Sequence, residues 1–344
     1  MAIWRRLWKH QKSGWDQQFA PTTSKNAGFT LIELLVSIIL ASLVVTPLLG
    51  FMINILQSDQ REQAKYATEQ DLRAAADYIA KDLEEAVYIY DRAGLASITD
   101  DYATVTCTGG CDSDTSAGSN LPADPDIVPV LVFWRRVFVP GIEIGEPDDA
   151  FAYSLVAYYL INDDDPTWSG ASRIGRFEIA GAVTDPFNAS ISLKNPDPGY
   201  NPFNLSETGT LQEKMNDWYK ADEPYDRDPI VLVDYIYSSS DDPPPFESCP
   251  EADGWTQVPD YDDPGVDPKF QTYGFYACVK SNSLNSNEPG ANEIARVFLR
   301  GNVLARLNDR DNIPSYNDDT SKVSFRNASF FPQTRIEVKG NGGL

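Results

Sequence analysis

The sequence contains a single histidine, His10, and that residue lies within the first 28 residues of the chain. Every later residue therefore works without an imidazole. This excludes a Ser-His-Asp or Cys-His catalytic pair from residues 29–344, and it excludes a zinc site with a histidine ligand there. We expect a chain that is not an enzyme and that carries no cofactor.

Cysteine is also scarce: the chain has only Cys107, Cys111, Cys249 and Cys278. Their spacing does not form the two C-x-x-C pairs typical of a zinc knuckle, so disulfides are the better interpretation. If the residues after the first 56 lie outside the cytoplasm, sequence order favours Cys107 with Cys111 and Cys249 with Cys278, although four cysteines allow three pairings. Four unpaired thiols remain the alternative.

Basic residues are few, with 28 Lys and Arg against 51 Asp and Glu and a net charge of −23. Residues 1–28 carry five basic residues and one acid, a net charge of +4, so the remainder carries −27. Binding DNA or RNA requires a basic surface that displaces counterions from phosphates. The composition therefore excludes nucleic acid as a partner.

One long apolar run, from Phe29 to Leu56, contrasts with this acidic composition and contains one acid and no base. It is longer than the roughly 7 to 15 apolar residues of a signal peptide, and it exceeds the roughly 20 that span a bilayer. Five basic residues precede it and none follows before Arg61. We predict a single-pass helix in the inner (plasma) membrane, with a cytoplasmic N-terminus and a periplasmic body. No A-x-A site follows the run, so we expect any cleavage to precede it.

Residues 25–33 read KNAGFTLIE, directly ahead of the apolar run. A basic residue, Gly28, Phe29 and Glu33 follow one another at spacings that resemble the prepilin motif of type IV pilin-like proteins. The resemblance implies that residues 1–28 are a leader, which a prepilin peptidase removes by cutting between Gly28 and Phe29. It also implies methylation of the new Phe29 amine and assembly of the mature chain into a filament.

Glu33 is the one ionisable residue of the apolar run. Placing such a group inside a membrane helix costs about 2.5 to 3.5 kcal/mol unless another group compensates its charge. The resemblance implies that its carboxylate meets the N-terminal amine of a neighbouring subunit and sets the axial register of the filament. A carboxylate that reaches to the membrane surface is the alternative. We predict a role for Glu33 in filament assembly.

The helix is expected to continue beyond the membrane. Pro47 lacks a backbone donor, which predicts a kink or local unwinding near residues 43–46, with or without a hinge function. From Leu72 to Tyr90, apolar residues recur at spacings of three and four, which predicts an amphipathic extension over residues 57–93 that ends at Gly94.

After this helix, runs rich in Val, Ile, Phe and Tyr alternate with clusters of Pro, Gly, Asn and Asp. They predict strands at residues 127–139, 152–161, 173–183, 230–237, 271–279, 295–307 and 321–325. Only one short helical pattern intervenes, at residues 211–219, so the sheet should be antiparallel. The predicted fold class is α+β and pilin-like: a long N-terminal helix packed on an antiparallel head, residues 94–344, with a loop-rich insertion at 184–229.

Two acidic clusters suit calcium by ligand type, namely Asp163, Asp164 and Asp165, and Asp260, Asp262 and Asp263. Neither follows the EF-hand spacing, so solvated loops are the simpler interpretation and we expect no metal. Two carboxylates at glycosidase distance arise by chance in a chain with 51 acids. The 12% aromatic content suits sugar stacking and a β-sheet core equally.

The segments VVTPLLGF, PIVLVDYIY and ARVFLRGNVLARL, together with the large head, resemble minor pseudopilins of the J or W type. They are most similar to the cyanobacterial hormogonium polysaccharide secretion pseudopilins. The resemblance implies a minor subunit of a type IV pilus-like or type II secretion-like filament that supports polysaccharide secretion and gliding motility. Its partners would be other major and minor pseudopilins, an inner-membrane assembly platform and the platform's ATPase. A filament-tip adhesin that binds sugar and a membrane-anchored carboxylate hydrolase are the alternatives.

Overall fold

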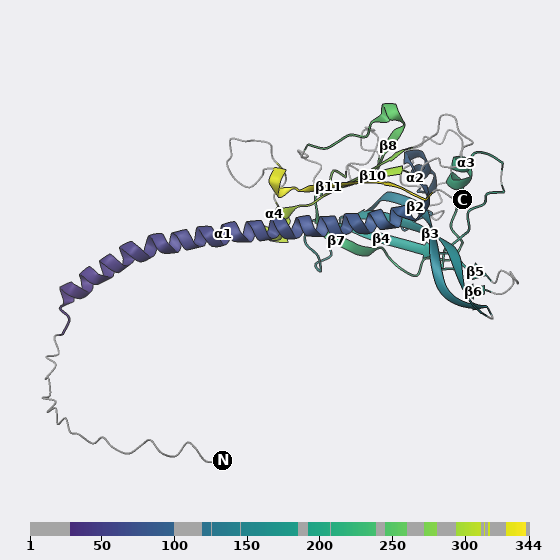
Figure 1. Cartoon of the computed structure of the whole chain (residues 1–344). Helices are drawn as coiled ribbons and strands as arrows, with labels where there is room; N and C mark the ends of the chain where they lie inside the picture. The colour runs from purple at the N-terminus through teal and green to yellow at the C-terminus, as the bar shows by residue number, and fades with distance from the viewer. Residues whose placement is uncertain are drawn as a thin grey trace, which may run out of the picture. The chain divides into compact units, whose positions relative to one another are not determined.

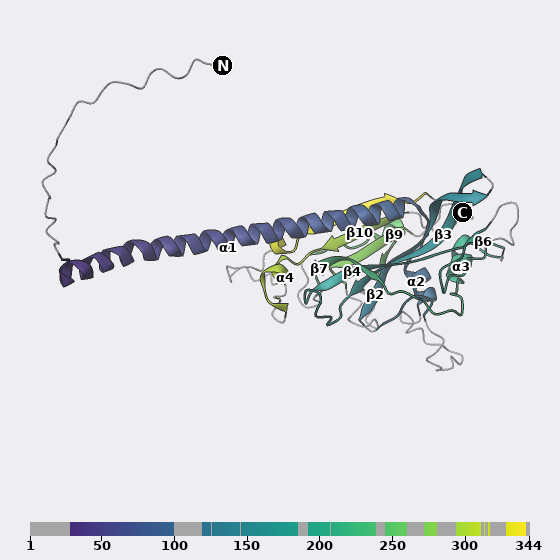
Figure 2. The same ribbon diagram turned by 90° about the horizontal axis from the view of Figure 1, so that it is seen from below.

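The computed structural model describes residues 28–99, 119–124, 126–144, 146–184, 192–206, 208–238, 245–259, 272–280, 294–310, 313, 316 and 328–341 (Figures 1 and 2). The chain divides between Leu56 and Gln57 into two compact units. Helix α1 (Leu31–Glu84) belongs to both of them, and all the strands lie in the second unit.

The second half of α1 packs against the strands of the second unit through a buried stripe. The stripe comprises Thr68, Leu72, Ala75, Ala76, Ile79, Asp82 and Leu83. Spacings of three and four place these residues on one side of the helix. In both views, this half of the helix runs along the strands (Figures 1 and 2).

The helix ends at Glu84, so its predicted extension to residue 93 was wrong. Residues 86–89 form strand β1 (Ala86–Ile89), and Gly94 lies inside the short helix α2 (Arg92–Ile98). The segment AVYIY favours a strand because it is rich in β-branched and aromatic residues. All four residues of β1 are buried, and a fully buried strand contains the same apolar spacings as a helix face.

The described strands form two main sheets, and every pairing is antiparallel, which confirms the predicted fold class. The larger sheet has the order β1, β2 (Ile127–Ile144), β3 (Glu146–Ile161), β4 (Ser172–Ala180), β7 (Ile230–Ile236). The smaller has the order β11 (Gln333–Lys339), β10 (Ile294–Arg300), β9 (Phe275–Lys280), β8 (Trp255–Val258). Strands β5 (Val183–Thr184) and β6 (Ser192–Lys194) form a separate pair.

Two details of the predicted strands needed correction. The predicted strand 295–307 ends at Arg300, and Val303–Leu307 form helix α4 instead. The N-cap of α4 is Asn302, whose side chain accepts a hydrogen bond from Ala305 N at 3.2 Å. A Gly-Asn pair followed by a capped turn stops a strand, and this local signal outweighed the apolar run. Besides β1, strands β6, β8 and β11 were not predicted, and residues 321–325 lie outside the described residues. The predicted short helix is α3 (Leu211–Asn216).

Aromatic residues of the larger sheet pack on both of its faces. Toward α1, Phe133 stacks on Tyr158 with ring centroids 6.3 Å apart. On the opposite face, Trp134 packs edge-on against Phe203 at 5.0 Å and Trp218 at 5.5 Å, both from the insertion at 184–229. The insertion therefore covers the face of the sheet that the helix leaves open.

A buried network of charges fixes the last turn of α1 to the larger sheet. Asp82 accepts hydrogen bonds from Arg135 Nη1 at 2.8 Å, Arg176 Nε at 2.7 Å and the Tyr158 hydroxyl at 2.7 Å. Arg135 and Arg176 also bind Glu178, at 2.7 Å and 2.9 Å. The helix dipole disfavours a carboxylate at the C-terminal end of a helix, so the two guanidinium groups stabilise Asp82 there. The network links α1 to three neighbouring strands.

Glu178 should make the second unit sensitive to acid. Burial by itself raises the pKa of the Glu178 carboxyl. The positive charges of Arg176 and Arg135 lower the pKa by a larger amount, so it lies below the ordinary value of 4.5. A carboxyl whose folded-state pKa is depressed adds stability above its unfolded pKa, and this stability is lost as the pH falls through the folded pKa. We expect Glu178→Gln to flatten the fall in the free energy of unfolding below about pH 4.5, measured by urea unfolding of the full chain in detergent.

The exposed Glu62→Gln is the matched control for this experiment, because it removes the same charge from α1 outside the network. It should leave the acid dependence unchanged. Equal pH slopes for wild type and Glu178→Gln would contradict the assignment.

Candidate functional site

The N-terminus of α1 is organised by Thr30. Glu33 N lies 3.3 Å from Thr30 Oγ1, and Leu34 N donates to Thr30 O at 3.1 Å, so Thr30 caps the helix. Phe29 precedes the cap and is 79% exposed. A side chain at Gly28 would have no heavy atom within 4 Å. The predicted cleavage bond between Gly28 and Phe29 therefore lies in an open segment directly ahead of a capped helix.

Glu33 lies in the first turn of α1, where the helix dipole favours a negative charge. A new amine at Phe29 would add a positive charge at the same end, which the dipole disfavours and which a nearby carboxylate such as that of Glu33 would offset. Among the described residues, no side chain is paired with Glu33. Its predicted partner, the amine of another subunit, remains a prediction.

The first half of α1 is apolar on all sides. Every residue from Leu31 to Leu56 is exposed. The most apolar window of the helix has a mean hydropathy of 2.5 and buries none of its residues within the described chain. A helix that is apolar all round is normally covered by lipid or by other helices. By length and composition, this segment fits a membrane anchor.

Pro47 does not interrupt the helix, which is continuous from Leu31 to Glu84. The local unwinding that the sequence allowed near residues 43–46 is therefore not observed. Proline removes one backbone hydrogen bond, and the turns on either side can keep the helix intact. A kink at this position remains a prediction.

Residues 23–49 match the family model described as the prokaryotic N-terminal methylation motif. The chain carries this methylation motif. The match contains the predicted cleavage bond, Glu33 and Pro47, and it supports a type IV pilin-like protein, a class of structural subunits. The motif implies processing by a prepilin peptidase and assembly with other pilins. Searches of curated proteins and of solved structures gave no match to the chain.

Two segments that carry the wider resemblance, PIVLVDYIY and ARVFLRGNVLARL, are neighbours in the fold. Tyr237 N donates to Arg300 O at 3.0 Å, and Asn302 N donates to Tyr235 O at 2.7 Å. Tyr235 has a φ of 63°, which is uncommon for a residue other than glycine. These bonds join the end of β7 to the end of β10 and connect the two sheets.

The same junction seats α1. A Cβ at Gly301 would lie 2.4 Å from Thr68 Cγ2, so only glycine permits this approach of β10 to the helix. Arg306 of α4 donates to Thr68 Oγ1 at 2.9 Å, pairs with Asp71, and lies 3.9 Å from the centroid of the Tyr235 ring. Sequence reasoning missed this junction, although the glycine inside an apolar run was the signal that could have indicated it.

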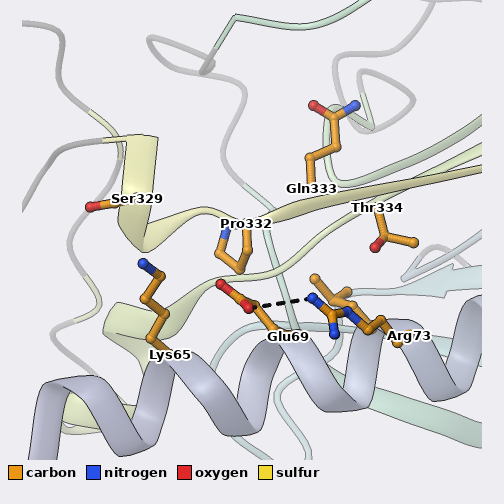
Figure 3. A pocket seen from close by; sticks show the side chains of 8 residues that line it. Lys65, Glu69, Arg73, Ser329, Pro332, Gln333 and Thr334 are labelled. Carbon is orange, nitrogen blue, oxygen red and sulfur yellow. Dashed lines mark ion pairs between the residues drawn. The ribbon is translucent and has the colours of Figure 1, made fainter.

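A hollow of about 360 Å³ lies beside this junction, between α1 and the start of β11 (Figure 3). Lys65 and Glu69 reach across it from the helix toward Pro332, and Glu69 pairs with Arg73 at 3.8 Å. Its lining contains one acid. A hydrolase that uses two facing carboxylates would need a second, so the hollow gives that alternative no support.

The weak calcium candidates Asp163 and Asp165 make hydrogen bonds within the segment around them. Arg173 Nη2 donates to Asp163 at 2.7 Å and lowers the pKa of that carboxyl, while Asp165 accepts from Thr167 N at 2.9 Å. Asp164 is fully exposed. Within the part of the chain that the structure describes, no three His, Cys, Asp or Glu residues are placed to hold a metal. The second acidic cluster, Asp260, Asp262 and Asp263, lies outside that part.

Cys249 and Cys278 form a disulfide, which confirms one of the two predicted pairings. Cys107 and Cys111 lie outside the described residues. Closing the loop between Cys249 and Cys278, 29 residues apart in sequence, stabilises the fold by roughly 3 to 4 kcal/mol in the chain-entropy model.

Proposed function

We propose that this chain is a minor pseudopilin, a structural subunit of a type IV pilus-like or type II secretion-like filament. The observation that carries the proposal is the methylation motif at residues 23–49, placed at the start of a helix that is apolar on all sides to Leu56. The acidic α+β unit that follows this segment suits a filament head. Assembly would be heterologous, with each subunit offering one face to a different face of the next, because such contacts build an open fibre.

In this proposal the peptidase cuts between Gly28 and Phe29 on the cytoplasmic side, and the head lies in the periplasm before entering a periplasmic or cell-surface filament. The net charge of +4 on residues 1–28 supports this orientation. The exposed Phe29 and the cap at Thr30 support the position of the cut.

We further propose that the filament supports polysaccharide secretion and gliding motility, with an inner-membrane platform and its ATPase driving assembly. The support is the resemblance of three segments to the polysaccharide secretion pseudopilins. Two of these segments meet where the head seats α1, so they are placed to set the position of the helix in the head.

One observation favours the alternative of a filament-tip adhesin. Phe138 and Phe151 face each other across the β2–β3 hairpin with ring centroids 5.5 Å apart, and each is about half exposed. Arg136 lies 3.8 Å from the centroid of the Phe151 ring. Exposed aromatic pairs of this kind suit stacking against a sugar or an apolar partner, and a purely structural subunit has no need to expose them.

The proposal is tested by expressing the full chain with and without a prepilin peptidase and determining its N-terminus by mass spectrometry. With the peptidase, we expect a chain that begins at a methylated Phe29 and co-purifies with other pilins. Gly28→Val should remain uncut, because it removes the glycine of the prepilin motif that residues 25–33 resemble. Gly50→Val, also in open surroundings, is the matched control and should be cut normally. A start at any other residue, or no pilin partner, would refute the proposal.

A further inference from the structure

Residues 245–250 lie as a strap across one face of the smaller sheet. This face is the one turned away from α1: Tyr276, Cys278 and Phe298 form a cluster separate from the main core, whereas the alternate residues of the same strands belong to the core with the helix. Arg300 Nη2 donates to the Pro245 carbonyl at 2.6 Å. The strap therefore covers an aromatic surface and is tied to it at its first residue.

The middle of the strap is held at Glu247. The Tyr276 hydroxyl donates to the Glu247 carbonyl at 2.8 Å, and Arg335 Nη1 lies 2.8 Å and 2.9 Å from the two carboxylate oxygens of Glu247. The Cys249–Cys278 disulfide holds its far end. The disulfide is thus the single covalent tie among several weaker contacts.

The two cysteines of this disulfide have different surroundings. Cys278 is completely buried among Tyr276, Phe298 and Trp255, whereas Cys249 is 8% exposed. Cys249 also lines a hollow of about 310 Å³. Disulfide exchange requires a thiolate to reach one sulfur, so access decides which of the two is attacked.

The hollow beside Cys249 is polar, with Ser248, Glu251 and Gln257 in its lining. Gln257 is 95% buried, and among the described residues its Nε2 has no hydrogen-bond partner. Its Oε1 lies 3.9 Å from Cys249 Sγ. A buried amide group without a partner is costly, so a ligand atom that accepts a hydrogen bond from Gln257 Nε2 would be stabilised there. Arg92 lies 3.7 Å from Glu251 and offsets its charge.

We propose that this hollow is a thiol-exchange site, at which a thiol ligand attacks Cys249 Sγ. The ligand thiolate forms a new sulfur–sulfur bond to Cys249, the bond between Cys249 and Cys278 breaks, and its electron pair leaves on the Cys278 sulfur, which takes up a proton. A second thiolate then attacks the ligand sulfur and releases Cys249, which is protonated. Two ligand thiols are oxidised to one disulfide and the protein disulfide is reduced.

Reduction removes this covalent tie and leaves the strap held by weaker contacts, among them the hydrogen bonds from Arg300 and Tyr276, the pair between Arg335 and Glu247, and the Phe246 ring against Tyr273 with centroids 5.2 Å apart. Cys249 is then no longer covalently bonded to the cluster that contains the stacked rings of Tyr276 and Phe298, whose centroids are 4.5 Å apart. Its backbone contact with Glu251 N, at 3.0 Å, still joins it to the turn before β8. The exchange site therefore governs how tightly the strap is held on an aromatic surface, independently of the role of the N-terminal helix.

The direction of attack is tested on the wild-type full chain in detergent, with reduced glutathione as the probe. After brief exposure, free thiols are alkylated and peptides are identified by mass spectrometry. We expect glutathione on Cys249 with alkylated Cys278 to exceed the reverse product by at least about tenfold, because Cys249 lines the hollow whereas Cys278 is completely buried and does not. Equal amounts of the two products, an excess on Cys278, or no adduct while the urea-unfolded chain reacts would each overturn the proposal.

The role of the hollow is tested with Gln257→Glu, which adds a negative charge where the thiolate must enter. We expect its exchange rate to fall at least about threefold through charge repulsion. The exposed Gln70→Glu of α1 makes the same chemical change elsewhere and should exchange at the wild-type rate. Equal rates for the two variants would show that the thiol does not enter through this hollow. If Gln257→Glu fails to fold, the product ratio of the wild type still decides the proposal.

Discussion

Replacing Asp82 by alanine is expected to lower the free energy of unfolding of the second unit by about 3 to 5 kcal/mol. Removing one member of a buried ion network leaves its partners charged and uncompensated, and this effect outweighs the loss of a single contact. Arg135 and Arg176 are each about 15% exposed, so water replaces little of what they lose. The measurement is urea unfolding of the full chain in detergent, followed by tryptophan fluorescence.

The Tyr158 hydroxyl adds to the expected cost. Burial and the charge of Asp82 raise the pKa of this hydroxyl, so it stays protonated and donates to the carboxylate at 2.7 Å. In Asp82→Ala the hydroxyl loses its acceptor. Asp82→Asn keeps a hydrogen-bond acceptor at this position while removing the charge, so it should be less damaging than Asp82→Ala.

Asp77→Ala is the matched control, because Asp77 is an exposed acid on the same helix outside the network. Its effect should stay within about 0.5 kcal/mol, as for most surface substitutions. An equally small effect for Asp82→Ala would mean that apolar packing alone attaches α1 to the sheet.

The N-terminal segment, residues 25–56, was predictable because its signals are local. The residues from Lys25 to Glu33 are contiguous, and the apolar run that begins at Phe29 needs no partner within the chain to be recognised. The antiparallel class followed from the absence of long helices between strands. The motif and the apolar run each needed a single stretch of sequence, whereas the antiparallel class needed only the absence of long helical patterns between the strand-like runs.

The end of α1 was not predictable from spacing. Residues 86–89 are all buried because β1 pairs with β2 on one side and lies in the core, so their pattern carries no alternation. Strand β11, in contrast, carries a local strand signal that was overlooked. It alternates exposed residues, among them Arg335 and Glu337, with half-buried ones, and this alternation was the signal that could have identified it.

The contacts that fix the head lie beyond any local pattern. Asp82 meets Arg176 across a sequence separation of 94 residues, and Arg306 reaches Thr68 across 238 residues. No periodicity signals such a pair, because each residue alone resembles an ordinary surface charge. The confirmed disulfide was predicted from the order of the cysteines alone. The position of residues 245–250 across the smaller sheet could not be predicted in this way.

Replacing Glu33 by alanine is expected to leave cleavage before Phe29 intact and to reduce incorporation into filaments by at least about tenfold. The physical reason is charge: Glu33 is the only acid between Phe29 and Leu56, and an uncompensated amine inside an apolar filament core costs several kcal/mol. Incorporation is measured as the fraction of the chain in sheared filaments relative to the membrane fraction.

Ser42→Ala is the control on the same helix, because the Ser42 hydroxyl donates only within the helix, to Ile39 O at 2.9 Å. It should assemble normally. Glu33→Asp keeps the charge on a shorter side chain and should restore part of the incorporation, whereas Glu33→Gln keeps the shape without the charge and should not. If Glu33→Gln assembled as well as wild type, the carboxylate would have no ionic partner in the filament, and reaching to the membrane surface would be its remaining role. The three substitutions at one position therefore separate charge from shape, which an alanine replacement alone cannot do.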